Sequence, residues 1–155
     1  MLIQAKSNTH LADAISTSRG SYILLMRLPE GKTITAGRLR PTIFPAGHYA
    51  YVGSALGGFR SRLNRHLRTE KKLHWHIDYL LQHASLNAII ICETEERAEC
   101  AIAKTLAQQF ESVPGFGASD CHCESHLFFT TADMTLPVIS ALEAVGLESR
   151  LKWQK

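Results

Sequence analysis

Two tyrosines and a nearby group of cationic residues are the side chains of this sequence best suited to catalysis. Tyr49 and Tyr51 stand two residues apart in an apolar, strand-like segment that ends in a glycine turn. Alternation along a strand places both rings on the same face of a sheet. The helix predicted next, over about 58–69, carries Arg62 and His66 four residues apart, so they share one side of it. A phenol, a guanidinium and an imidazole brought together can hold a phosphodiester and move protons near it.

The same helix opens a concentrated basic block. Between residues 60 and 72 the only acid is Glu70, although the whole chain carries a net charge of just +3. A local basic surface on a balanced chain favours an anionic partner, and a solvated helix face is the alternative. We expect Arg65 and Arg68 to point outward, and Trp75 either to stack on a base or to pack on an inserted loop. The candidate nucleic-acid contacts are Arg60, Arg65, Arg68, Lys71, Lys72 and Trp75.

Glu99 is the residue least expected at its position. It precedes Ile102, Leu106 and Phe110 at the spacing of a helical apolar stripe, which places it on the inward face. A buried carboxylate is costly unless it is paired or binds a cation. Glu99 is therefore a candidate metal ligand. An ion pair with an arginine, or an exposed glutamate in the first turn, would also explain it.

Two histidine-containing segments are weaker candidates. His74 and His76 cannot share a helical face, whereas His74 and Asp78 can, so a structural role is favoured for this segment. A later loop holds Cys121, Cys123 and His126. Zinc sites usually place two to four residues between paired cysteines. A fourth ligand would have to come from elsewhere, such as His74, His76 or His122. We therefore expect a loop lining the active site or packing beneath it, rather than a zinc site.

The elements that must position these side chains are short strands and amphipathic helices within one domain, residues 1–155. Residues 1–19 are expected to form a short helix or an arm. Thr94 is the predicted N-cap of the helix that carries Glu99, with Glu95 in its first turn. Predicted strands cover 22–28, 33–36, 38–44, 49–52, 86–92 and 126–130, and predicted helices cover 58–69, 74–82, 94–110 and 133–145. The fold class is α+β, a small antiparallel sheet flanked by helices.

Composition excludes several classes of protein. No apolar run reaches the roughly 18 residues needed to cross a bilayer, and the N-terminus lacks the pattern of a secretory signal. Four cysteines are too few for a disulfide scaffold. We expect a cytoplasmic protein that does not associate with membranes.

The motifs Gly20-Ser21-Tyr22 and Tyr51-Val52-Gly53, followed by Arg62 and Glu99, resemble the GIY-YIG nuclease superfamily in order and residue type. Three longer runs resemble one branch of it, found alone or fused to endonuclease III-type repair glycosylases. They are Phe44–Ala55, His74–Tyr79 and Gly115–Cys121. The resemblance implies a core over about 20–110 and a C-terminal strand and helix over about 126–146. The stretch between the two tyrosine motifs is longer than usual, and we expect extra strands there.

The resemblance implies a metal-dependent endonuclease that hydrolyses DNA in repair or processing, and it leaves RNA open as a substrate. Tyr51 would act as base or relay towards the attacking water, and Arg62 would bind the scissile phosphate. Glu99 would hold one Mg²⁺ or Mn²⁺. His66 would bind phosphate or assist the leaving group, and Tyr22 would shape the pocket. The alternatives are a non-catalytic nucleic-acid-binding module, with Glu99 paired to Arg62, and a zinc-stabilised interaction protein.

Overall fold

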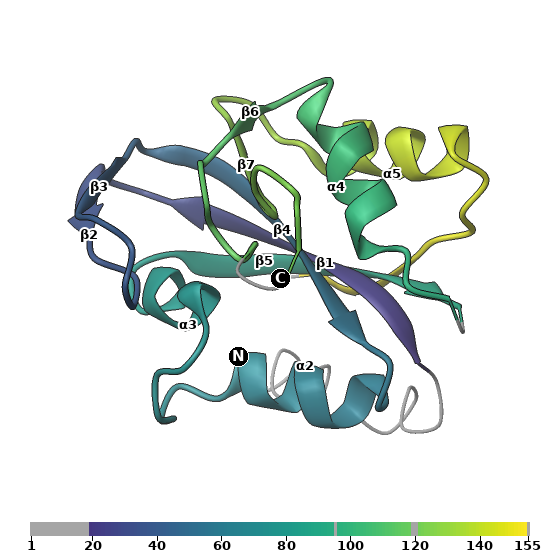
Figure 1. Cartoon of the computed structure of the whole chain (residues 1–155), viewed down its shortest axis with the longest axis horizontal. Coiled ribbons are helices and arrows are strands. Elements are labelled where there is room, and N and C mark those ends of the chain that lie inside the picture. Colours follow the sequence, from purple (N-terminus) through teal and green to yellow (C-terminus); the bar gives the residue numbers. More distant parts are fainter. Residues whose placement is uncertain (1–18, 95, 119–120, 155) are drawn as a thin grey trace.

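A six-stranded antiparallel sheet forms the centre of the molecule (Figure 1). The structure is a computed structural model that describes residues 19–94, 96–118 and 121–154. The strand order is β6-β7-β4-β1-β5-β8. The strands are β1 (Gly20–Leu28), β4 (Gly47–Ala55), β5 (Ser85–Glu93), β6 (Glu111–Ser112), β7 (Leu127–Thr130) and β8 (Arg150–Gln154). A separate hairpin, β2 (Lys32–Ile34) with β3 (Thr42–Phe44), lies between β1 and β4 in the sequence. It supplies the extra strands expected between the two tyrosine motifs.

Helices cover both faces of the sheet (Figure 1). One face packs on α2 (Phe59–Leu67) and α3 (His76–Leu81), and the other packs on α4 (Glu99–Ala107) and α5 (Thr135–Ala144). Alternate residues of the central strands feed two separate apolar cores, as strand geometry requires. The predicted α+β class, with an antiparallel sheet flanked by helices, is confirmed. No helix of the described residues is long and apolar enough to cross a membrane.

The pairing of β1 with β4 brings the two tyrosine motifs side by side. Tyr22 lies opposite Gly53, and Leu24 lies opposite Tyr51. A Cβ atom at Gly53 would sit 2.3 Å from Cζ of Tyr22, so only glycine leaves room for the ring to cross the neighbouring strand. Tyr49 and Tyr51 both contribute to the core that contains α2, which confirms that they share a face.

Several predicted boundaries were wrong. Thr94 does not cap α4, because its amide still donates to the carbonyl of Arg19 and its hydroxyl accepts from the amide of Glu96. The helix begins only at Glu99, after Ala98, and it ends at Ala107 rather than Phe110. Strands β6 and β8 were not predicted, because pairing with β7 and β5 defines them rather than an apolar pattern of their own. The expectations for residues 1–18 and Glu95 fall outside the described residues.

Candidate active site

A cleft of about 600 Å³ opens beside the second half of β4. Tyr51 lies on β4, Arg62 on α2 and Glu99 at the start of α4, and all three line this cleft. The fold therefore brings together three of the five predicted catalytic residues from three separate elements. The other lining residues are Val52, Gly53, Ser54, Leu56, Gly57, His74, Trp75, His76, Arg97, Gly117, Cys121 and His126.

The remaining two predicted residues lie beneath the cleft, not in its wall. Tyr22 is fully buried and His66 is 4% exposed. The hydroxyl of Tyr22 and Nε2 of His66 are 2.6 Å apart and share a hydrogen bond. The His66 ring also stands edge-on to the ring of Tyr51, with 6.4 Å between centroids. Tyr22 and His66 thus form a polar pair that supports the residues of the cleft floor.

Burial shifts the pKa values of these groups further towards the uncharged form. Burial is the main reason that the pKa of Tyr51 is raised to about 12, although the nearby Arg62 guanidinium acts in the opposite direction. Burial likewise raises the pKa of Tyr22 well above its usual range. Burial, together with the positive charge of Lys71, lowers the pKa of His66 to about 3. A neutral, enclosed imidazole is poorly placed for the phosphate contact expected of His66, and its geometry suits a supporting role through Tyr22.

Glu99 faces the cleft from the first residue of α4. It is half-buried, whereas Ile102 and Leu106, which follow it on the same side of the helix, are fully buried in the core. Within the described ranges the Glu99 side chain forms no hydrogen bond or ion pair, so the pairing with Arg62 required by the non-catalytic alternative is not formed. It is also the sole carboxylate among the described residues that line the cleft. A half-buried, unpaired carboxylate can accept a cation.

Arg65 does not point into solvent as expected. Its two terminal nitrogens donate to the two carboxylate oxygens of Asp78 at 2.6 and 2.7 Å. Asp78 is fully buried, and it also accepts the amides of His74 and Trp75 at 2.8 Å each. Burial acts to raise the pKa of Asp78, but these bonds outweigh it and hold the value at about 2. The sequence pattern could not show this pair, because its partners come from different helices.

Trp75 lies under two arginines. The guanidinium carbon of Arg62 stands 4.4 Å from the centroid of a Trp75 ring, and that of Arg65 stands 4.1 Å away. Such cation–π contacts hold the long side chains against the ring. The indole therefore packs against α2 and orients Arg62 at the edge of the cleft. The expected packing of Trp75 on an inserted loop is thus replaced by packing against the arginines of α2.

The basic block divides into structural and exposed members. The ammonium of Lys71 donates to the carbonyls of Arg65 and His66, and so caps the C-terminal end of α2. Arg60, Arg68 and Lys72 are exposed. A hollow of about 400 Å³ is lined by Arg65, Arg68, Lys71, Lys72 and His74. His74 also lines the cleft, so the basic hollow adjoins it.

The loop before β7 closes one side of the cleft. The amide of Gly117 donates to Nδ1 of His76 at 2.8 Å. Gly117 has a φ of +69°, and a Cβ atom there would stand 3.0 Å from Cε1 of Tyr51. Glycine thus allows the loop to lie directly against the Tyr51 ring. Sequence reasoning missed Arg97 as a lining residue. The only available signal was its position two residues before the candidate metal ligand.

Comparison with known proteins adds one finding. A family model described as "Domain of unknown function DUF123" matches residues 21–152. The chain belongs to this DUF123 family. All five predicted catalytic residues lie inside the matched range. No curated protein and no solved structure matches the chain significantly.

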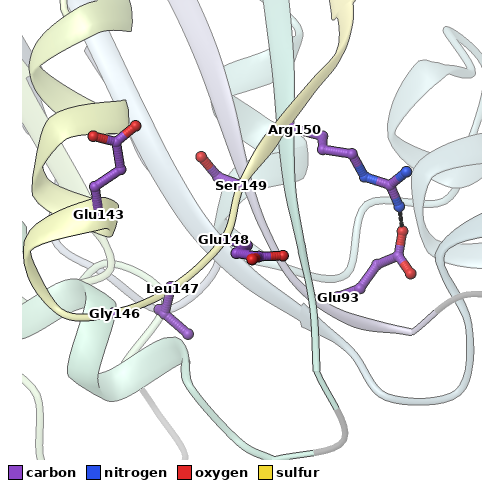
Figure 2. A pocket seen from close by; sticks show the side chains of 7 residues that line it. All are labelled: Glu93, Glu143, Gly146, Leu147, Glu148, Ser149 and Arg150. Atoms are coloured by element: carbon purple, nitrogen blue, oxygen red, sulfur yellow. Dashed lines mark ion pairs between the residues drawn. The ribbon is translucent and has the colours of Figure 1, made fainter.

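This DUF123 chain has a second cleft, of about 650 Å³, at the far end of α5 (Figure 2). Its residues come from the end of β5, from α5, from the turn after it and from the start of β8. Arg150 forms an ion pair with Glu93 there, which joins β8 to β5. None of the predicted catalytic residues lines this cleft. The second cleft is therefore not the candidate active site, and Tyr51, Arg62 and Glu99 line only the first cleft.

Proposed function

We propose that this protein is a metal-dependent endonuclease that hydrolyses DNA phosphodiester bonds in the manner of the GIY-YIG nucleases. The observation that carries the proposal is the meeting of Tyr51, Arg62 and an unpaired Glu99 in one cleft. The three side chains span almost fifty positions, and each comes from a different element of the fold. The adjoining basic hollow supplies the positive surface that a nucleic-acid backbone requires.

Arg62 is the group that would bind the scissile phosphate. Its guanidinium packs on Trp75 and stays at the cleft surface, half-buried and always charged. A planar guanidinium can donate to two phosphate oxygens at once. As water attacks phosphorus, negative charge grows on those oxygens, and a donor already in place stabilises that charge.

Tyr51 would order the attacking water. With its pKa raised to about 12, the side chain is a neutral phenol at neutral pH, able both to accept and to donate a hydrogen bond. It can therefore hold a water molecule and pass a proton onward. Acting as a full base would need further positive charge nearby, and Arg62 already acts in that direction. The His66 ring stands edge-on to the Tyr51 ring, and Gly117 lies directly against it, so both restrict its position.

Glu99 fits the requirements of a single hard divalent cation. Mg²⁺ and Mn²⁺ prefer oxygen ligands, and Mg²⁺ is commonly held by one or two carboxylates together with waters and substrate phosphates. Glu99 offers one free carboxylate at the wall of an open cleft. A bound Mg²⁺ or Mn²⁺ would neutralise phosphate oxygens and favour ionisation of water.

The proposal is tested with the purified protein, a panel of linear, branched and damaged DNAs, and Mn²⁺ or Mg²⁺. The wild-type protein should cleave at least one of these substrates, and Glu99→Gln should abolish cleavage. The glutamine keeps the shape of the side chain but removes the charge that holds the cation. Folding and DNA binding should be nearly unchanged.

Glu96→Gln is the matched control. Glu96 is an exposed glutamate three residues before Glu99 and does not line the cleft, so its variant should cleave normally. Cleavage by Glu99→Gln at the wild-type rate would refute the metal role. DNA binding without cleavage of any substrate would instead support the non-catalytic module. The same cleavage assay on a panel of RNAs shows whether DNA or RNA is the substrate.

A further inference from the structure

A cluster of potential metal ligands joins the loop that closes the cleft to the start of α4. The ligand atoms of Cys100, Cys121, Cys123 and His126 all lie within 4.8 Å of one another. Sγ of Cys121 stands 3.4 Å from Nε2 of His126. All four cysteines of the chain are free thiols. Cys100 comes from the first turn of α4, and the other three ligands precede β7.

The size of the cluster suits a tetrahedral ion. Zinc–sulfur bonds of about 2.3 Å and zinc–nitrogen bonds of about 2.0 Å place tetrahedral sulfur and nitrogen ligands roughly 3.5 to 3.8 Å apart. The observed sulfur–nitrogen distance of 3.4 Å is close to this spacing. Three thiols and one imidazole also form a common ligand set of structural zinc sites.

We propose that Cys100, Cys121, Cys123 and His126 bind one structural zinc ion. Four protein ligands complete the tetrahedron, which is typical of structural rather than catalytic zinc. Three thiolates around Zn²⁺ leave one net negative charge. The N-terminal end of α4, where Cys100 lies, offsets that charge. The exposed Lys104, one helical turn further on, adds a positive charge close to the cysteines.

The ion would connect α4 to the loop that lies on Tyr51. His126 and Cys121 line the cleft as well as belonging to the cluster, and Glu99 directly precedes Cys100. Zinc would therefore hold both the loop and the start of α4 in place. This site is distinct from the cation proposed at Glu99, because thiolates and imidazole select zinc whereas a carboxylate suits Mg²⁺ or Mn²⁺.

Sequence reasoning disfavoured zinc because the C-x-C spacing is short and a fourth ligand could not be identified. The structure supplies Cys100, which lies about twenty residues before the loop and belongs to a different element. None of the histidines suggested as the fourth ligand is part of the cluster.

The test begins with the wild-type chain, expressed with added zinc and purified under reducing conditions. Elemental analysis should find one zinc ion per chain. After exchange into cobalt, the protein should show thiolate-to-cobalt charge transfer and the visible bands of a tetrahedral site. A chelator should lower the melting temperature, because an ion bound only by the folded state stabilises it.

Variants locate the ion. Cys100→Ser and Cys123→Ser should lose the bound zinc, whereas Cys92→Ala should keep it, because Cys92 is buried in β5 outside the cluster. Loss of zinc from Cys92→Ala to the same extent would overturn the assignment. So would a wild-type protein that holds no zinc and takes up no cobalt, or one that carries a disulfide among these cysteines. The wild-type measurements decide the question even if a serine variant fails to fold.

Discussion

At the scale of single residues, burial decides what each polar group of the site can do. Tyr22 and His66 are enclosed and bonded to each other, so they can position their neighbours but do not face the cleft. Tyr51, Arg62 and Glu99 are partly exposed in the cleft, so they are the groups that can reach one. Residue types alone do not separate these two sets.

Replacing Arg62 tests the proposed phosphate contact. Arg62→Ala should lower kcat on the order of 10²-fold or more, because a donor that stabilises transition-state charge is lost. Arg62→Lys should recover only part of the rate, since lysine keeps the charge but not the planar pair of donors. Steady-state kinetics on the cleaved DNA measures both. A variant that changes KM alone would show that Arg62 contributes binding and no transition-state stabilisation.

The buried imidazole predicts how stability depends on pH. The pKa of His66 is lowered to about 3, whereas an unfolded histidine titrates near 6.5. Between these values the unfolded chain binds one more proton than the folded chain. His66 therefore causes a loss of stability as pH falls below about 6.5, by up to about 1.4 kcal/mol per pH unit.

The measurement is the free energy of unfolding against pH for the wild type and for His66→Gln, from pH 7 down to about pH 4. The variant cannot titrate at this position, so its curve should be shallower. The slopes are compared and not the absolute stabilities, because glutamine also changes the packing around Tyr22. Parallel curves would mean that His66 titrates alike in both states.

At the scale of elements, the site depends on close contacts between neighbours. β1 and β4 approach at Gly53, where the Tyr22 ring takes the space of a missing side chain. The Arg65–Asp78 pair joins α2 to α3 while Asp78 caps the start of α3. These contacts fix the direction of α2 and hence the position of Arg62 at the cleft.

Gly53→Ala tests the strand contact. The new Cβ atom would lie 2.3 Å from Cζ of Tyr22, so either the ring or a strand must move. We expect a loss of about 1–3 kcal/mol, the usual cost of overpacking. Gly57→Ala is the matched control, because no atom lies within 4 Å of a Cβ there, and neither glycine has a positive φ. Urea unfolding compares the two variants, and equal stabilities would contradict the proposed contact.

At the scale of the whole molecule, a basic hollow lies beside the candidate active-site cleft. The net charge of +3 is small, yet exposed cations gather in the hollow beside the cleft. Arg65 and Lys71 are already engaged in structural bonds, which leaves Arg68 and Lys72 as exposed members of that hollow. These two are the cations best placed to meet a phosphate backbone.

Replacing both Arg68 and Lys72 with alanine should weaken DNA binding and flatten the log–log salt dependence by about one to two units. Each cation that meets a phosphate releases counterions, so its removal lowers the slope. Arg27→Ala with Lys32→Ala is the matched control: it removes the same charge from exposed positions that line neither the hollow nor the cleft. If both double variants lowered the slope of the salt dependence equally, DNA binding would depend on net charge and not on the hollow.

The sequence alone determined the features that depend on local periodicity. Alternation placed Tyr49 and Tyr51 on one face of the sheet, and helical spacing placed Ile102 and Leu106 on the inward face of their helix, as the structure confirms. The α+β class and the extra strands between the two tyrosine motifs were also predictable. These features follow from backbone geometry, because side chains on one face of a strand or helix recur every two or 3.6 residues along the sequence.

Tertiary structure alone decided which side chains meet across elements. Asp78 binds Arg65 and withdraws it from solvent, and Cys100 lies beside Cys121, Cys123 and His126 of a distant loop. His66 is enclosed because Tyr22 and Trp75 pack against it. No local pattern encodes such contacts, since each depends on the packing angle between elements far apart in the chain. The burial of His66 and the pairing of Arg65 with Asp78 are therefore visible only in the tertiary structure.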